Sequence, residues 1–92
     1  MSDSQSKTLT ITNRRGLHAR ASAKFVAVVA EHDAVVEVRR NGTTVNGDSI
    51  MGLMMLAASI DTTIDVTASG AGAADVLAAL EDLLARRFDE GE

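Results

Sequence analysis

The 92-residue sequence has no cysteine, proline, tryptophan or tyrosine, and only two phenylalanines. Without cysteine the chain can form neither a disulfide nor a thiolate metal site, which suits a reducing compartment. The shortage of aromatics leaves few side chains on which bases could stack, and with a net charge of −4 this argues against a nucleic-acid partner. So short a chain supports a single domain, whose core must consist of Val, Ile, Leu, Met and Ala.

Long hydrophobic runs are also lacking. No apolar stretch approaches the roughly 20 residues of a membrane span, and the polar residues 1–6 show no signal-peptide pattern. We therefore expect a cytoplasmic protein without membrane insertion. Residues 1–40 hold seven Lys/Arg against four Asp/Glu, whereas residues 41–92 hold two against nine. The N-terminal half could thus face an anion or an acidic partner.

Hydrophobic periodicity predicts a mixed α+β domain. Alternating or β-branched segments predict strands over residues 7–13, 34–40, 43–45 and 61–69, and Asn41-Gly42 indicates a hairpin between the second and third. Helical spacing and Ala-rich composition predict helices over residues 19–31, 50–59 and 73–88. The order β-α-β-β-α-β-α implies a four-stranded antiparallel sheet with three helices on one face. Residues 7–88 then form the domain, between a flexible N-terminus (1–6) and a C-terminal tail (89–92).

The segment between the first strand and the first helix contains the candidate site for binding and accepting a phosphoryl group. His18 stands where a helix begins, so unpaired backbone N–H groups and the helix dipole would favour an anion beside it. Arg20 adds a fixed cation with bidentate geometry for phosphate oxygens, and Gly16 permits a tight backbone approach. Imidazole can accept a phosphoryl group at neutral pH. A surface or capping role for His18 is the alternative that the pattern leaves open.

Two motifs give this sequence a family resemblance. Residues 16–20, Gly-Leu-His-Ala-Arg, resemble the active-site signature of the HPr family, and residues 49–54, Ser-Ile-Met-Gly-Leu-Met, resemble its second signature. The family is the histidine-containing phosphocarrier of the phosphoenolpyruvate-dependent phosphotransferase system. Its fold is an open-faced sandwich with the same element order. The resemblance covers residues 7–88.

The resemblance implies a role for each matching residue. His18 would accept a phosphoryl group at Nδ1 from Enzyme I and pass it to IIA-type proteins, and Arg20 would neutralise the group in transfer. Ser49 would be a regulatory site for an HPr kinase/phosphorylase, although a serine there also suits a helix cap. Two positions depart from the family: Ala21 replaces the usual proline, and Asp48 precedes the serine where many members have a basic residue.

The second helix has more apolar residues than one face can bury. Leu53, Leu56, Ala57 and Ile60 follow helical spacing and are expected to pack on the sheet. This leaves a methionine set elsewhere, either filling an irregular core or forming an adaptable surface. The resemblance favours the surface, as the apolar part of a docking site. The expected partner-binding residues are Ala19, Arg20, Ile50, Met51, Met54 and Met55.

No site for catalytic turnover is visible in the sequence, which has no paired acid and base, metal cluster or nucleotide loop. We therefore expect a stoichiometric phosphoryl carrier that needs no cofactor. We also expect a monomer, and a solvated His32 between Glu31 and Asp33. Two alternatives remain open at this stage. A regulatory, nitrogen-type HPr-like module would use the same chemistry at His18. A small-ligand sensor of similar topology would instead need a pocket between sheet and helices.

Overall fold

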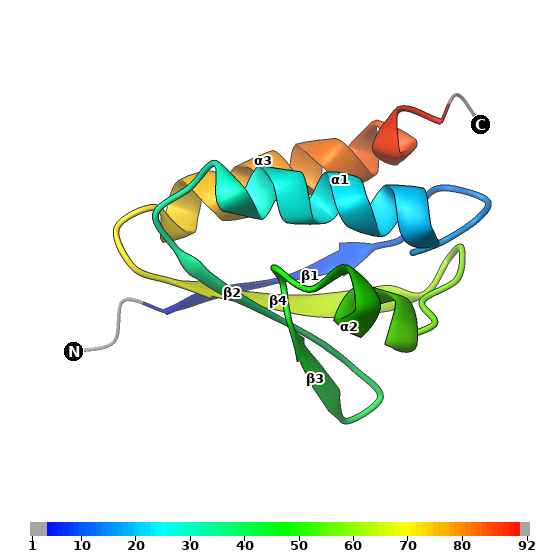
Figure 1. Cartoon of the computed structure of the whole chain (residues 1–92), viewed down its shortest axis with the longest axis horizontal. Helices are drawn as coiled ribbons and strands as arrows, with labels where there is room; N and C mark the ends of the chain where they lie inside the picture. Colours follow the sequence, from blue (N-terminus) through cyan, green and yellow to red (C-terminus); the bar gives the residue numbers. More distant parts are fainter. Residues whose placement is uncertain (1–3, 91–92) are drawn as a thin grey trace.

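A computed structural model describes residues 4–90 and shows the predicted α+β sandwich (Figure 1). The elements follow the order β1 (Gln5–Thr10), α1 (Ala19–Ala30), β2 (Val35–Arg40), β3 (Thr43–Asn46), α2 (Ile50–Met55), β4 (Thr63–Ser69) and α3 (Ala73–Ala85), with a short 3₁₀ turn at Arg87–Asp89. The strands form one antiparallel sheet in the order β1-β4-β2-β3. The predicted element order and fold class are therefore confirmed.

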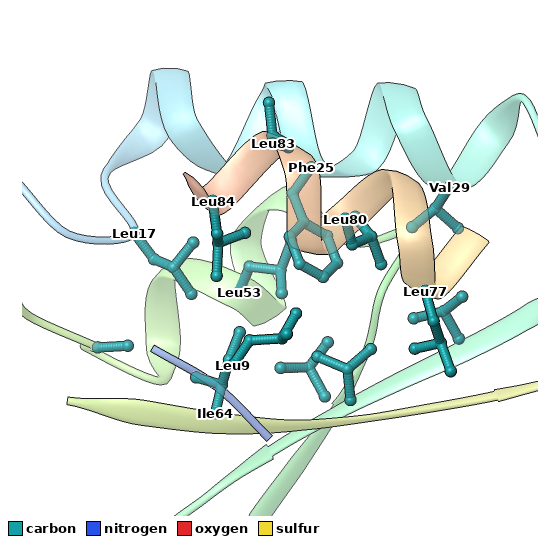
Figure 2. Close-up of a cluster of buried hydrophobic side chains, with 14 of the residues drawn as sticks. Leu9, Leu17, Phe25, Val29, Leu53, Ile64, Leu77, Leu80, Leu83 and Leu84 are labelled. Carbon is teal, nitrogen blue, oxygen red and sulfur yellow. The ribbon is translucent and has the colours of Figure 1, made fainter. Parts of the chain in front are cut away.

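The core lies between the sheet and the helices (Figure 2). Alternate strand residues point into it, such as Leu9 of β1 opposite Ile64 of β4. Phe25 of α1 and Leu80 of α3 meet them from above and are fully buried. Burying a side chain of this size contributes about 1.5–3 kcal/mol. The period-2 and helical patterns of the sequence thus converge on one apolar layer.

The opposite sheet face is polar and exposed. Thr8 of β1 donates a hydrogen bond to Asp65 of β4 at 2.8 Å, and Ser6 pairs with Thr67 at 2.9 Å. The strand β1 begins at Gln5, which pairs with Ala68 of β4. This is two residues before the predicted start at residue 7, inside the segment expected to be flexible. Residues 1–3 of that segment lie outside the described part of the chain.

The hairpin between β2 and β3 has the predicted Asn-Gly turn. Asn41 and Gly42 have φ angles of 51° and 80°. Two consecutive positive values are what a type I′ turn requires, and its twist matches that of the flanking strands. The sequence motif therefore determines the turn and the strand register.

The helix α2 is shorter than predicted, and part of its predicted buried face is wrong. It ends at Met55, Arg40 donates a hydrogen bond to the Leu56 carbonyl at 3.0 Å, and Ala57 takes a left-handed φ of 51°. Leu53 and Leu56 are buried as expected. Ala57 and Ile60 are exposed because both lie beyond Met55, where the helix and its spacing have ended.

The C-terminal prediction is also corrected. The helix α3 ends at Ala85, and Arg87, Phe88 and Asp89 all have φ between 54° and 61°. Phe88 is fully buried, and Lys24 of α1 donates a hydrogen bond to its carbonyl at 2.7 Å. Asp89 and Glu90 therefore belong to an ordered turn, with Asp89 exposed and the Glu90 side chain buried, and not to the C-terminal tail expected from residue 89. Residues 91–92 of that tail lie outside the described part.

Candidate functional site

The loop between β1 and α1 has a shape fixed by its own sequence. The Gly16 N–H donates to the Asn13 carbonyl at 3.2 Å, and the Asn13 side-chain amide donates to the Gly16 carbonyl at 2.8 Å. Gly16 has a φ of +65°, and a Cβ there would collide with the carbonyl oxygen of Ala58. Leu17 N–H donates to the same carbonyl at 2.9 Å. The loop is thus tied to the segment that follows α2.

His18 ends this loop and is the N-cap of α1. Its Nδ1 accepts a hydrogen bond from the backbone N–H of Arg20 at 3.3 Å, so this nitrogen carries a lone pair and no proton. The imidazole keeps 23% of its side-chain surface exposed. The predicted phosphoryl acceptor therefore has its unprotonated nitrogen at the positive end of a twelve-residue helix.

Basic side chains surround one side of the site. Arg15, Arg20 and Lys24 line a polar pocket of about 400 Å³, together with Asp89 and Glu90. The side chain of Arg20 is exposed. The structure therefore places Arg20 beside His18, because His18 is the N-cap of α1 and Arg20 lies in its first turn. The pocket also contains carboxylates, which sequence analysis did not place there.

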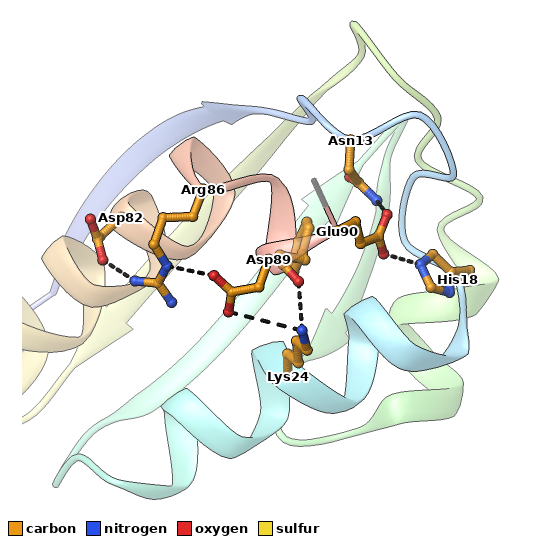
Figure 3. Close-up of polar contacts among 8 residues, drawn as sticks. Asn13, His18, Lys24, Asp82, Arg86, Asp89 and Glu90 are labelled. Atoms are coloured by element: carbon orange, nitrogen blue, oxygen red, sulfur yellow. Dashed lines mark hydrogen bonds and ion pairs between the residues drawn. The ribbon is translucent and has the colours of Figure 1, made fainter. Parts of the chain in front are cut away.

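The residue that sequence analysis missed is Glu90 (Figure 3). Its carboxylate contacts Nε2 of His18 and accepts a hydrogen bond from the Asn13 amide at 3.0 Å. Burial alone would raise the pKa of the Glu90 carboxyl, but hydrogen bonds from His18 and Asn13, aided by nearby positive charge, outweigh this and leave the pKa below its ordinary value. No sequence signal pointed to this contact, because Phe88, which anchors the turn, continues the helical spacing of α3.

An apolar patch on α2 lies on the surface as the resemblance suggested. The Met patch comprises Ile50, Met51, Met54 and Met55, which line a depression of about 460 Å³. Met51 and Met55 are 73% and 72% exposed, so the methionines do not fill the core. The Met patch is close in the chain to Ala58, whose carbonyl binds the His18 loop.

Ser49 is the N-cap of α2, and its Oγ accepts a hydrogen bond from the Gly52 N–H at 3.0 Å. It is half-buried and lies next to Ile50 at the start of the Met patch. The capping role expected from sequence is therefore present, and Ser49 immediately precedes the first residue of the patch in the chain.

Other candidate features have simpler explanations. His32 is half-buried, and its Nδ1 contacts the Val28 carbonyl at 2.8 Å near the end of α1, so the expectation of a solvated residue is only partly met. Within residues 4–90 no three His, Cys, Asp or Glu side chains gather as a metal site would require. No helix in the same range has the length and apolarity to cross a bilayer.

Comparisons with known proteins agree on one family. A family model described as the PTS HPr component phosphorylation site matches residues 5–86. Phosphocarrier protein HPr of Neisseria meningitidis is 46% identical over 86 residues, covering 94% of this chain and 97% of the relative. A crystal structure of HPr from Thermoanaerobacter tengcongensis superposes with a TM-score of 0.89 at 34% identity, covering 94% and 97% of the two chains.

A crystal structure of an HPr dimer from Thermoanaerobacter tengcongensis is also similar, with a TM-score of 0.71, 33% identity and coverage of 87% and 92%. That dimer belongs to its own protein. The monomer expected for this chain remains a prediction.

Proposed function

Because the chain belongs to the HPr family, the phosphocarriers of the phosphotransferase system, we propose that it carries a phosphoryl group on Nδ1 of His18. The group would come from phospho-Enzyme I, itself charged by phosphoenolpyruvate, and pass to IIA-type proteins. The carrier is used stoichiometrically and requires no cofactor of its own.

The observation that carries this proposal is the position of Nδ1. Its lone pair faces the first turn of α1, where the Arg20 N–H now donates to it. In transfer, Nδ1 forms a bond to phosphorus as the donor's bond to phosphorus breaks, and that bonding pair stays with the donor. The phosphoryl oxygens then occupy the space next to the helix N-terminus, where N–H groups and the dipole favour negative charge.

Arg20 is proposed to neutralise the group during transfer. Its side chain is exposed and lines the polar pocket beside the first turn of α1. A guanidinium can bind two phosphoryl oxygens at once, and this geometry suits a group that changes partner. Ala19 shares this first turn and is also exposed, which fits the expectation that it contacts partners.

Incubation with phosphoenolpyruvate and purified Enzyme I tests the function. We expect the intact mass to increase by one phosphoryl group, which is acid-labile and stable to base, as phosphohistidine is. No mass gain with an Enzyme I that charges another HPr would contradict the proposal.

The Met patch is proposed as the apolar part of the surface that docks Enzyme I and IIA-type proteins. The hydrogen bond from the Leu17 N–H to the Ala58 carbonyl joins the His18 loop to the segment that follows α2, so the patch and the proposed acceptor are linked within the fold. Methionine side chains adapt to different partners, which suits a carrier that must meet both donor and acceptor.

Charge substitutions on the two faces of α2 should have different effects. Met51→Glu and Met54→Glu should weaken association with Enzyme I by roughly tenfold, about 1–2 kcal/mol, and leave the fold intact. Leu53→Glu should unfold the protein, because it buries an unpaired charge in a marginally stable domain. Calorimetric titration and circular dichroism measure the two effects. Equal unfolding by all three variants would show that the methionines are core residues.

Ser49 is proposed as a site of regulatory phosphorylation by an HPr kinase/phosphorylase. A phosphate on its hydroxyl adds about two negative charges at the border of the Met patch. Docking requires that patch to lose water, so the charge would hinder association with Enzyme I. Asp48 precedes the serine where many family members have a basic residue, and the kinase would have to accept it.

Ser49→Asp imitates this charge and should slow phosphorylation of His18 without lowering the melting temperature. The carboxylate can still accept the Gly52 N–H, so the cap is kept. Thr63→Asp on the open sheet face is the control for added charge. Repeating the rate measurement at high salt separates obstruction of docking from long-range repulsion between the added charge and the phosphoryl group. Repulsion across solvent is screened beyond a Debye length of about 8–10 Å, so a defect that persists at high salt comes from obstructed docking. Equal rates for wild type and Ser49→Asp at low salt would reduce Ser49 to a cap.

A further inference from the structure

The carboxylate of Glu90 is part of the His18 site and not a chance surface contact. One oxygen contacts Nε2 of His18, and the other accepts the Asn13 amide at 3.0 Å (Figure 3). The side chain of Glu90 is only 7% exposed. Ion pairs on an open surface contribute little, but a carboxylate this buried, with both oxygens bound, is held in one orientation.

A C-terminal turn holds Glu90 in this place. Its three left-handed residues, Arg87–Asp89, reverse the chain beyond α3, and an apolar anchor in the core, Phe88, fixes the turn. Lys24 of α1 donates to the Phe88 carbonyl at 2.7 Å, and Arg86 pairs with Asp89 at 3.1 Å. Left-handed backbone is unfavourable for side chains such as these, so it persists because the surrounding contacts require it. The turn connects the last helix to the imidazole.

Asn13 links this turn to the loop. Its amide donates both to the Gly16 carbonyl and to Glu90, while it is itself fully buried. The segment that shapes the approach to His18 therefore also fixes the carboxylate. Both ring nitrogens of His18 then have a defined partner: the Arg20 N–H at Nδ1 and the Glu90 carboxylate at Nε2.

We propose that Glu90 is a positioning residue that keeps the proton of His18 on Nε2, so that Nδ1 is the nitrogen that accepts and releases the phosphoryl group. The Glu90 carboxylate can only accept a hydrogen bond from Nε2, and the Arg20 N–H can only donate one to Nδ1, so together they select a single neutral tautomer. This inference rests on the proposed function for its consequence in transfer, whereas the tautomer is a property of the free protein.

Glu90 would act both when His18 receives the phosphoryl group and when His18 releases it. When Nδ1 bonds to phosphorus, the proton on Nε2 stays, and the ring becomes a cation opposite the carboxylate. When an acceptor attacks the phosphorus, the Nδ1–P bond breaks, its electron pair returns to Nδ1, and the ring is neutral again. The carboxylate thus faces positive charge that exists only while the group is bound, and no proton has to leave the site.

Nitrogen NMR and transfer kinetics test this role together. In wild type, the ¹⁵N spectrum of neutral His18 should show an unprotonated Nδ1 and a protonated Nε2. Glu90→Ala should increase the fraction with the proton on Nδ1 and slow phosphorylation by Enzyme I on the order of tenfold, the lower end of the loss found when the hydrogen-bond partner of a metal-binding histidine is removed. Glu90→Gln, which keeps an acceptor oxygen but no charge, should lie between the two.

Glu81→Gln is the matched control, because it removes one carboxylate that pairs with Lys7 of β1 at 2.8 Å. It should leave both the tautomer and the transfer rate unchanged. A Glu90→Ala protein that transfers at the wild-type rate, or that keeps the wild-type tautomer, overturns the proposal. If wild type itself gains no phosphoryl group, the proposed function fails, and the ¹⁵N spectra still decide whether Glu90 selects the tautomer.

Discussion

His18→Ala is expected to abolish the gain of a phosphoryl group from phosphoenolpyruvate and Enzyme I. The change removes the nitrogen proposed to bond to phosphorus, and within residues 4–90 the other histidine, His32, lies near the far end of α1 with its Nδ1 against the Val28 carbonyl. The change also removes the N-cap of α1, which typically costs about 1 kcal/mol. His18→Asn retains a capping side chain and separates loss of the acceptor from loss of the cap.

The matched control is His32→Ala, which should gain one phosphoryl group at the wild-type rate. Intact mass spectrometry measures the gain, and circular dichroism shows that each variant is folded. A gain that persists in folded His18→Asn, or that disappears in His32→Ala, assigns the acceptor to a residue other than His18.

The sheet and its hairpin could be predicted because their signals are local. Alternation places Leu9 and Ile64 on one face regardless of what packs against it, and Asn41-Gly42 specifies its own turn. The His18 loop was found for a similar reason. Its glycine, histidine and arginine are neighbours in the sequence, so the family resemblance on which the proposed chemistry rests can be recognised without knowing the fold.

The two helix ends that were missed depend on contacts between distant segments. The helix α2 stops at Met55, and Arg40, sixteen residues before Leu56, caps the carbonyl there. The spacing from Leu53 to Ile60 alone would allow another turn of helix. Phe88 likewise continues the spacing of α3, yet it enters the core from a left-handed turn. Tertiary contacts overrode local periodicity in both places.

Glu90 could not be assigned from sequence because its partners are 72 and 77 residues away. Residues 89–92 are Asp-Glu-Gly-Glu, and so acidic a composition is typical of a solvated segment. The buried Phe88 ring, the hydrogen bond from Lys24 to the Phe88 carbonyl and the hydrogen bond from the Asn13 amide turn Glu90 toward the imidazole. The histidine proposed as acceptor could be chosen from the sequence, whereas the carboxylate that contacts its Nε2 required the fold.

Arg20→Ala should slow phosphoryl transfer by about 10²–10³, the usual cost of removing one group that stabilises charge in a transition state. The backbone N–H of Arg20, not its side chain, donates to Nδ1 of His18, so truncation leaves the acceptor in place. Because the side chain is exposed, the free energy of unfolding should change by no more than about 0.5 kcal/mol. A large loss of rate with little loss of stability distinguishes a role in transfer from one in folding.

Two further variants show which property of Arg20 matters. Arg20→Lys keeps the charge but loses the planar fork, so it should recover only part of the rate if bidentate binding of phosphoryl oxygens is needed. Arg39→Ala removes another exposed arginine, from β2, and should transfer at the wild-type rate. Stopped mixing with phospho-Enzyme I and rapid quenching give the rate constants. A rate for Arg20→Ala within about twofold of wild type is far smaller than the loss expected for a transition-state contact, and it would show that the arginine is only solvated.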